Sequence, residues 1–92
     1  MKLYKYKNDR ANASGPKIKQ LREDLGLSQE QLAAKLQLAG LNLNQKAISR
    51  IENGERVIPD FELFYFSEAL HVPISTLLST EDHVNTEHAL FF

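Results

Sequence analysis

A row of hydrogen-bonding side chains lies along one side of the short helix predicted within NLNQKAISRIENGER, residues 42–56. Asn44 is suited to the N-cap of this helix, and Gly54 is suited to the position just past its end. At about 100° per residue, the polar side chains share a sector of about 140°. They are Gln45, Lys46, Ser49, Arg50 and Asn53. An ordinary surface helix needs no such set, so the pattern predicts an external partner rich in hydrogen-bonding groups.

The opposite side of the same helix is apolar. Ala47, Ile48 and Ile51 would pack inward, and Glu52 lies at the boundary between the two sides. The major groove of B-DNA is about 12 Å wide and admits one α-helix. Gln suits a bidentate contact to adenine, and Arg or Lys suits guanine. The polar side therefore favours the reading of bases in double-stranded DNA, with a plain solvated surface as the alternative.

The charges of the chain are distributed unevenly along its length. Residues 1–56 hold all 11 Lys and Arg together with 6 Asp and Glu, a net charge of +5. Residues 57–92 hold 6 acidic residues and no Lys or Arg, a net charge of −6, so the whole chain carries −1. This asymmetry indicates one surface for a polyanion and another for something else. The alternative is chance clustering on a solvated surface.

Several classes of protein are disfavoured by composition. The 92 residues contain no Cys, which excludes disulfides and thiolate metal sites. No Gly-rich phosphate loop and no G-x-S-x-G motif occurs, and His71, His83 and His88 match no strong zinc spacing. No apolar run approaches the ~20 residues of a membrane span. We therefore expect a cytoplasmic protein that is not an enzyme and has no cofactor, metal site, membrane segment or domain for a small-molecule ligand.

Turn and cap signals divide the chain into three parts. Residues 1–13 form a basic arm, whose Lys2, Lys5 and Lys7 we expect to touch phosphates. Residues 80–92 form an acidic tail that ends in two Phe. Between them, residues 14–79 predict five helices, which lie within 14–26, 27–40, 44–54, 60–70 and 73–79. The fold class is thus all-α.

Individual residues mark where these helices begin. Pro16 suits a first helical position, and Ser28 with Gln31 matches a capping box for the second helix. Asp60 is the N-cap candidate of the fourth helix. Two short helices joined by a tight connection, the second with a polar side, form the helix-turn-helix arrangement.

Three stretches carry a resemblance to a known family: LREDLGLSQEQLAAKL, AISRIENGERVIP and FSEALHVPISTLL. Together they resemble the helix-turn-helix family of phage repressors, Cro proteins and xenobiotic-response-element regulators, over roughly residues 15–79. The resemblance implies a compact five-helix bundle of the phage-repressor DNA-binding domain type. It also implies a transcriptional regulator that places its third helix in the major groove.

The resemblance also implies roles for single residues. Base contacts fall to Gln45, Lys46 and Arg50, with Ser49 as a further candidate, and the family pattern gives Gln29 and Asn53 to the DNA backbone. Arg56, Lys17 and Lys19 are added as phosphate contacts because cationic side chains serve that purpose. Arg22 and Glu52 match a pair that bridges the first and third helices in related proteins, which is a structural role. Gln29 as a surface residue and Asn53 as a helix-end residue remain the alternatives.

One departure from the family pattern is the lengthened connection between the second and third helices, within QLAGLNLN. The extra residues extend the second helix, lengthen the connection, or do both. Leu38, Leu41 and Leu43 are expected to bury there, which argues against a loose loop. The tilt of the third helix is left open by this departure.

The fourth helix is apolar on nearly every side, and one small core cannot bury all of its apolar side chains. We expect this helix, the helix within 73–79 or the end of the tail to pair two protomers. The candidate residues are Phe61, Phe64, Tyr65, Phe66, Phe91 and Phe92. A two-fold homodimer would read a palindromic operator. The alternative is a protein-interaction module that has kept the fold without specific DNA binding, with this surface as its working face. The sequence does not identify the operator or the target genes.

Overall fold

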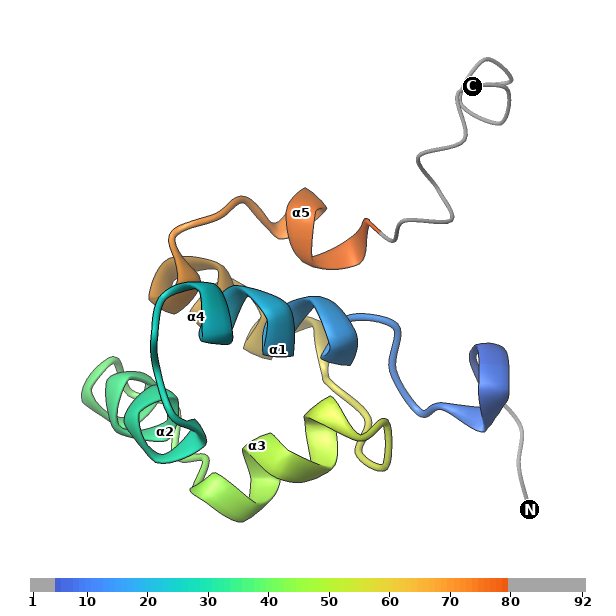
Figure 1. Cartoon of the computed structure of the whole chain (residues 1–92), viewed down its shortest axis with the longest axis horizontal. Helices are drawn as coiled ribbons and strands as arrows, with labels where there is room; N and C mark the ends of the chain where they lie inside the picture. The colour runs from blue at the N-terminus through green and yellow to red at the C-terminus, as the bar shows by residue number, and fades with distance from the viewer. Residues whose placement is uncertain (1–4, 80–92) are drawn as a thin grey trace.

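Five α-helices follow one another along the part of the chain that the structure, a computed structural model, describes, residues 5–79 (Figure 1). They are α1 (Gly15–Asp24), α2 (Gln29–Leu38), α3 (Gln45–Glu52), α4 (Asp60–Leu70) and α5 (Ile74–Leu78), and a short 3-10 turn η1 (Lys7–Asp9) precedes them. Residues 5–79 contain no strand beyond an isolated bridge between Tyr6 and Arg10. The predicted all-α, five-helix fold is confirmed.

Every helix contributes a fully buried side chain to a single core. The members with no exposed surface are Ile18, Leu32, Leu36, Ile48, Ile51, Phe66 and Leu77. Helix α1 runs through the middle of the bundle and packs against α3, α4 and α5, while α2 packs against α3 and α4 (Figure 1). Helix α3 is therefore covered by α1 and α2 on its inner side.

Local signals in the sequence fix the ends of α2 and α3. The Ser28 side chain accepts from the Gln31 amide at 3.0 Å, and the Gln31 side chain accepts from the Ser28 amide at 2.8 Å, which completes the capping box. The Asn44 side chain accepts from the Ala47 amide at 2.9 Å and starts α3. Beyond α3, Gly54 adopts a φ of +83°, a conformation that favours glycine. The predicted caps of these helices are thus confirmed.

Residues 39–44 form the lengthened connection between α2 and α3, while α2 itself ends at Leu38. Leu41 and Leu43 are buried, and the Gln37 side chain donates to the Leu43 carbonyl at 2.8 Å. The expected burial of Leu38 was wrong, because this side chain is 90 % exposed. Leu38 follows Leu36 by about 200° around the helix, so it faces away from the core that holds Leu36.

Helix α4 corrects two expectations. Phe66 is fully buried in the core, so it cannot belong to a surface that pairs two protomers. Asp60 is the first residue of the helix, with Pro59 at the N-cap position and no side-chain cap. The Asp60 carboxylate instead lies in the first helical turn, where negative charge interacts favourably with the helix dipole.

None of the helices within residues 5–79 combines the length and apolar character needed to cross a bilayer.

Candidate nucleic-acid interface

The outward side of α3 carries the hydrogen-bonding residues singled out from the sequence. Gln45, Lys46 and Arg50 are exposed, and Ser49 is partly exposed. Their helix is anchored by Ile48 and Ile51, which have no exposed surface. The structure therefore brings the four predicted base-contacting residues together on the exposed side of one short helix.

A buried ion pair lies behind this surface, between α1 and α3. The Arg22 guanidinium donates to the Glu52 carboxylate through Nε at 2.7 Å and Nη2 at 3.1 Å, and through Nη1 to the Leu27 carbonyl at 2.6 Å. Only 9 % of the Arg22 side chain and 2 % of the Glu52 side chain are exposed. Hydrogen bonding to Glu52 raises the pKa of Arg22 above its ordinary value. The structure thus joins the two residues expected to bridge these helices.

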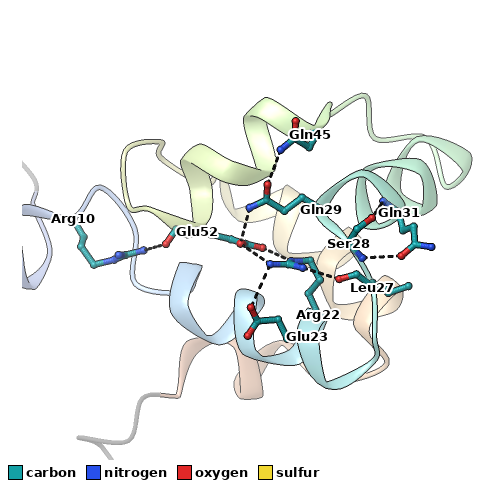
Figure 2. A network of polar contacts seen from close by, with 9 residues as sticks. All are labelled: Arg10, Arg22, Glu23, Leu27, Ser28, Gln29, Gln31, Gln45 and Glu52. Carbon is teal, nitrogen blue, oxygen red and sulfur yellow. Dashed lines mark hydrogen bonds and ion pairs between the residues drawn. The ribbon is translucent and has the colours of Figure 1, made fainter.

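A chain of hydrogen bonds runs from this ion pair to the exposed end of α3 (Figure 2). Gln29 Nε2 donates to Glu52 Oε1 at 3.0 Å, and Gln45 Nε2 donates to Gln29 Oε1 at 2.7 Å. Gln29 is partly buried, whereas Gln45 is exposed. The orientation of the Gln45 amide is therefore set from the interior of the protein.

The residues predicted to contact phosphates occupy different settings. Lys19 and Asn53 are exposed, Lys17 is partly exposed, and Asn53 is the C-cap residue of α3. Arg56 instead donates to the Glu62 carboxylate on α4, through Nη1 at 2.8 Å and Nη2 at 3.2 Å. This bonding raises the pKa of Arg56 above its ordinary value. A phosphate contact by Arg56 stays a prediction, and such a contact would share a guanidinium that already joins α4 to the segment after α3.

Two residues ahead of α1, Arg10 and Asn12, contact the C-terminal end of α3 and were not predicted from the sequence. The side chains of Arg10 and Asn12 donate to backbone carbonyls of α3 and of the segment after it. Asn12 has a local signal, because its side chain accepts from the Gly15 amide three residues on, a common role for Asn before a helix. Arg10 has none, because its partners on α3 are distant in sequence.

A second exposed surface lies on α4. Phe61 and Phe64 are 55 % and 62 % exposed, and with Tyr65 and Glu68 they line an open pocket. Phe91 and Phe92 lie outside the described residues. The aromatic surface on α4 is defined here as Phe61, Phe64 and Tyr65. Within residues 5–79 no group of three or more His, Asp or Glu could hold a metal ion.

Helix α2, the connection and α3, with a polar surface on the outer side of α3, define a helix-turn-helix domain built to bind DNA. A family model described as helix-turn-helix matches residues 18–77, which is more than half of the 92 residues. The chain belongs to this family, in the group of the Cro proteins, phage repressors and xenobiotic-response-element regulators. A comparison with curated proteins gave no match. Membership of this family supports the prediction that the protein is a DNA-binding helix-turn-helix regulator.

Proposed function

We propose that this protein is a sequence-specific transcriptional repressor that inserts α3 into the major groove of double-stranded DNA as a homodimer. The observation that carries this proposal is the exposed row on α3, Gln45, Lys46 and Arg50, on a helix whose inner side is fully buried. Such a helix fits the groove and presents its side chains to base edges. A dimer bound in this way covers its operator and excludes other proteins from it, which is why we infer repression.

The contacts made by Gln45 leave it equipped to read adenine. An amide has two N–H donors and one oxygen with two acceptor sites. One Gln45 donor is used on Gln29, so the other donor and the oxygen are available for adenine N7 and N6. Lys46 and Arg50 are exposed donors suited to guanine O6 and N7. Within residues 5–79 the Arg50 guanidinium is paired with Glu55 at 3.8 Å, a solvated pair that a guanine can replace.

The phosphate contacts follow from the same arrangement. Gln29 gives one N–H to Glu52 and has a second N–H that we assign to a phosphate. Lys17, Lys19 and Asn53 are assigned to the backbone on either side. These contacts fix the register of the protein on the duplex and carry no sequence information themselves.

We assign dimerisation to the aromatic surface on α4. Phe61 and Phe64 are exposed apolar side chains on one helix, and burial of such area drives association. A two-fold dimer places its recognition helices about 34–36 Å apart, which is one turn of DNA. We therefore propose a palindromic operator.

Selection from a random duplex pool tests the function. Wild-type protein and the triple variant Gln45→Ala/Lys46→Ala/Arg50→Ala are each incubated with the pool, and the retained duplexes are sequenced. We expect the wild type to enrich a palindrome and the triple variant, folded by circular dichroism, to enrich nothing. If the wild type enriches no sequence, or if both proteins enrich the same one, the protein is an interaction module and α4 is its working surface.

Light scattering tests the dimer. The wild type at high micromolar concentration should have twice the mass of one chain, and with the selected duplex it should have that mass plus the mass of the duplex. The variant Phe61→Ser/Phe64→Ser without DNA should have the mass of one chain. A monomeric wild type under both conditions would contradict the assignment.

A further inference from the structure

The segment that precedes α1 holds the C-terminal end of α3. The Ala11 amide donates to the Gly54 carbonyl at 2.7 Å, and Asn12 Nδ2 donates to the carbonyls of Ile51 at 3.0 Å and Arg56 at 2.8 Å. This segment lies ahead of residues 18–77, the part that matches the helix-turn-helix family. It therefore lies outside the matched part, and it contacts the helix that we assign to the major groove.

The Asn12 amide is satisfied completely by these contacts. Its side chain is buried, its nitrogen makes the two bonds just described, and its oxygen accepts from the Gly15 amide at 2.8 Å and from Arg10 Nη2 at 3.4 Å. A single side chain thus ties the start of α1 to the end of α3. Because the amide is buried and fully bonded, it specifies one relative placement of these two helix ends.

Arg10 covers the last turn of α3. Its Nη2 donates to the Glu52 carbonyl at 3.1 Å (Figure 2). The same Nη2 donates to the Ile51 carbonyl at 3.4 Å, and Nε donates to the Asn12 carbonyl at 3.3 Å. The last carbonyls of a helix have no partner within the helix, and they form the negative end of its dipole. A guanidinium at this position satisfies these carbonyls and complements their charge.

Two glycines leave the space that this guanidinium occupies. A Cβ atom at Gly54 would lie 2.7 Å from Cζ of Arg10, and a Cβ at Gly15 would overlap both the Ile51 carbonyl oxygen and Arg10 Nη2. A larger residue at Gly54 would displace the Arg10 side chain, and one at Gly15 would also push α1 away from the end of α3. The close approach of α1 and α3 is thus built around Arg10 as well as around the core.

We propose that Arg10 and Asn12 are positioning residues for DNA binding, which fix the tilt of α3 in the major groove. This inference rests on the proposed function. The eight residues of α3 are held at the N-terminal end through Gln29 and Gln45 and at the C-terminal end by Arg10 and Asn12. Arg50 lies in the last turn and Gln45 in the first. Release of the C-terminal end therefore moves Arg50 more than Gln45.

The test compares three variants on the selected operator: Arg10→Gln, Arg10→Lys and, as the control, Gln20→Ala. Gln20 is an exposed residue of α1 with no assigned DNA contact, so its replacement leaves both the assigned site and the contacts of Arg10 with α3 in place. We expect Arg10→Gln to raise Kd roughly tenfold, since hydrogen bonds from a charged donor are lost. Base preference should fall at the pair read by Arg50 and persist at the pair read by Gln45. Arg10→Lys should behave like Arg10→Gln, because an ammonium lacks the planar fork that reaches several carbonyls.

Two results would overturn the proposal. If the slope of log K against log salt falls by about 0.9 in Arg10→Gln, the guanidinium binds a phosphate directly. If Arg10→Lys binds and discriminates like the wild type, positive charge alone suffices and no positioning is involved. An unchanged slope with the altered base preference supports the proposal.

Hydrogen exchange gives a readout that does not depend on DNA. In Arg10→Gln the amides of the last turn of α3 and of Gly54 should exchange faster, while amides in the middle of α2 keep their rates. If the wild type binds no specific DNA, the proposed function fails, yet this measurement still reports whether Arg10 holds α3. Unchanged exchange at these amides would overturn the positioning role in either case.

Discussion

Helices α3 and α4 are consecutive in the chain, and they present opposite kinds of surface to the outside. Helix α3 buries Ile48 and Ile51 and exposes Gln45, Lys46 and Arg50. Helix α4 buries Phe66, Ala69 and Leu70 and still exposes Phe61 and Phe64. Both helices serve the same core, so their outer sides are free to differ.

The difference shows which partner each helix suits. A partner that offers hydrogen-bonding groups in a groove wide enough for one helix, such as the major groove of DNA, matches the polar side chains on α3. An apolar partner matches the aromatic surface on α4, whose neighbourhood includes Asp60 and Glu68, both exposed. These carboxylates would repel phosphates, so α4 is unsuited to the DNA side of the molecule.

The largest expected change in stability distinguishes the buried Phe66 from the exposed Phe64 on α4. Phe66→Ala should lower the free energy of unfolding by about 3–5 kcal/mol, because a fully buried ring leaves a cavity. Phe64→Ala, the matched control, should change it by no more than about 0.5 kcal/mol at low protein concentration. Urea unfolding followed by circular dichroism measures both. Equal losses would place Phe64 in the core and remove it from the aromatic surface.

A smaller loss is expected for the ion pair behind α3. Glu52→Gln should cost about 3 kcal/mol, because it leaves the buried Arg22 guanidinium without its counter-charge. The control is Glu55→Gln in the exposed pair with Arg50, which should change stability by about 0.5 kcal/mol or less. Urea unfolding again decides, and equal effects would mean that burial of the Arg22 pair is unimportant.

The same ion pair makes the free energy of unfolding depend on pH through Arg22. The folded-state pKa of Arg22 lies above its unfolded value, because Glu52 stabilises the charged form. The contribution of the Arg22 charge is therefore fully present at every pH below the ordinary arginine pKa, and it is lost only as the pH rises through the raised value. At physiological pH this end of the pair does not titrate.

The smallest expected effect concerns the support of Gln45. Gln29→Ala should weaken binding to the selected operator roughly tenfold, because the support of Gln45 and the assigned phosphate contact are both lost. Gln20→Ala, an exposed residue of α1, should leave binding unchanged. Fluorescence anisotropy with the operator and with a duplex altered at the adenine assigned to Gln45 measures the discrimination. An equal loss on both duplexes would restrict Gln29 to a phosphate contact.

The features that could be predicted from the sequence depend on neighbouring residues or on the helical period. The caps at Ser28 and Asn44 act within one turn, and the two sides of α3 differ sharply in polarity. The pairing of Arg22 with Glu52 was available only because the family resemblance supplied it. The assignments to bases, phosphates and a partner protomer remain predictions.

Two of the errors lie where periodicity gives no answer, and the error at Leu38 went against it. Helix α4 is apolar on nearly every side, so the sequence does not say that Phe66 turns inward while Phe64 turns outward. Leu38 ends α2 on its outer side, where the helical period places it, although its residue type suggested burial. Arg10 bonds to carbonyls that only tertiary folding brings near. The hydrogen bonds of Arg10 depend on the packing of α1 against α3, and no local sequence pattern predicts that packing.

In the series of hydrogen bonds that joins Arg22, Glu52, Gln29 and Gln45, each donor is determined by the acceptor before it. An ionised carboxylate can only accept, so Glu52 obliges Gln29 to present its nitrogen inward and its oxygen outward. That oxygen in turn obliges Gln45 to present a nitrogen to Gln29. The buried charge of Glu52 therefore determines, through two hydrogen bonds, which end of the exposed Gln45 amide points toward Gln29. Neutralising that charge would free both amides to turn over, and Gln45 would then offer a base the reverse order of donor and acceptor.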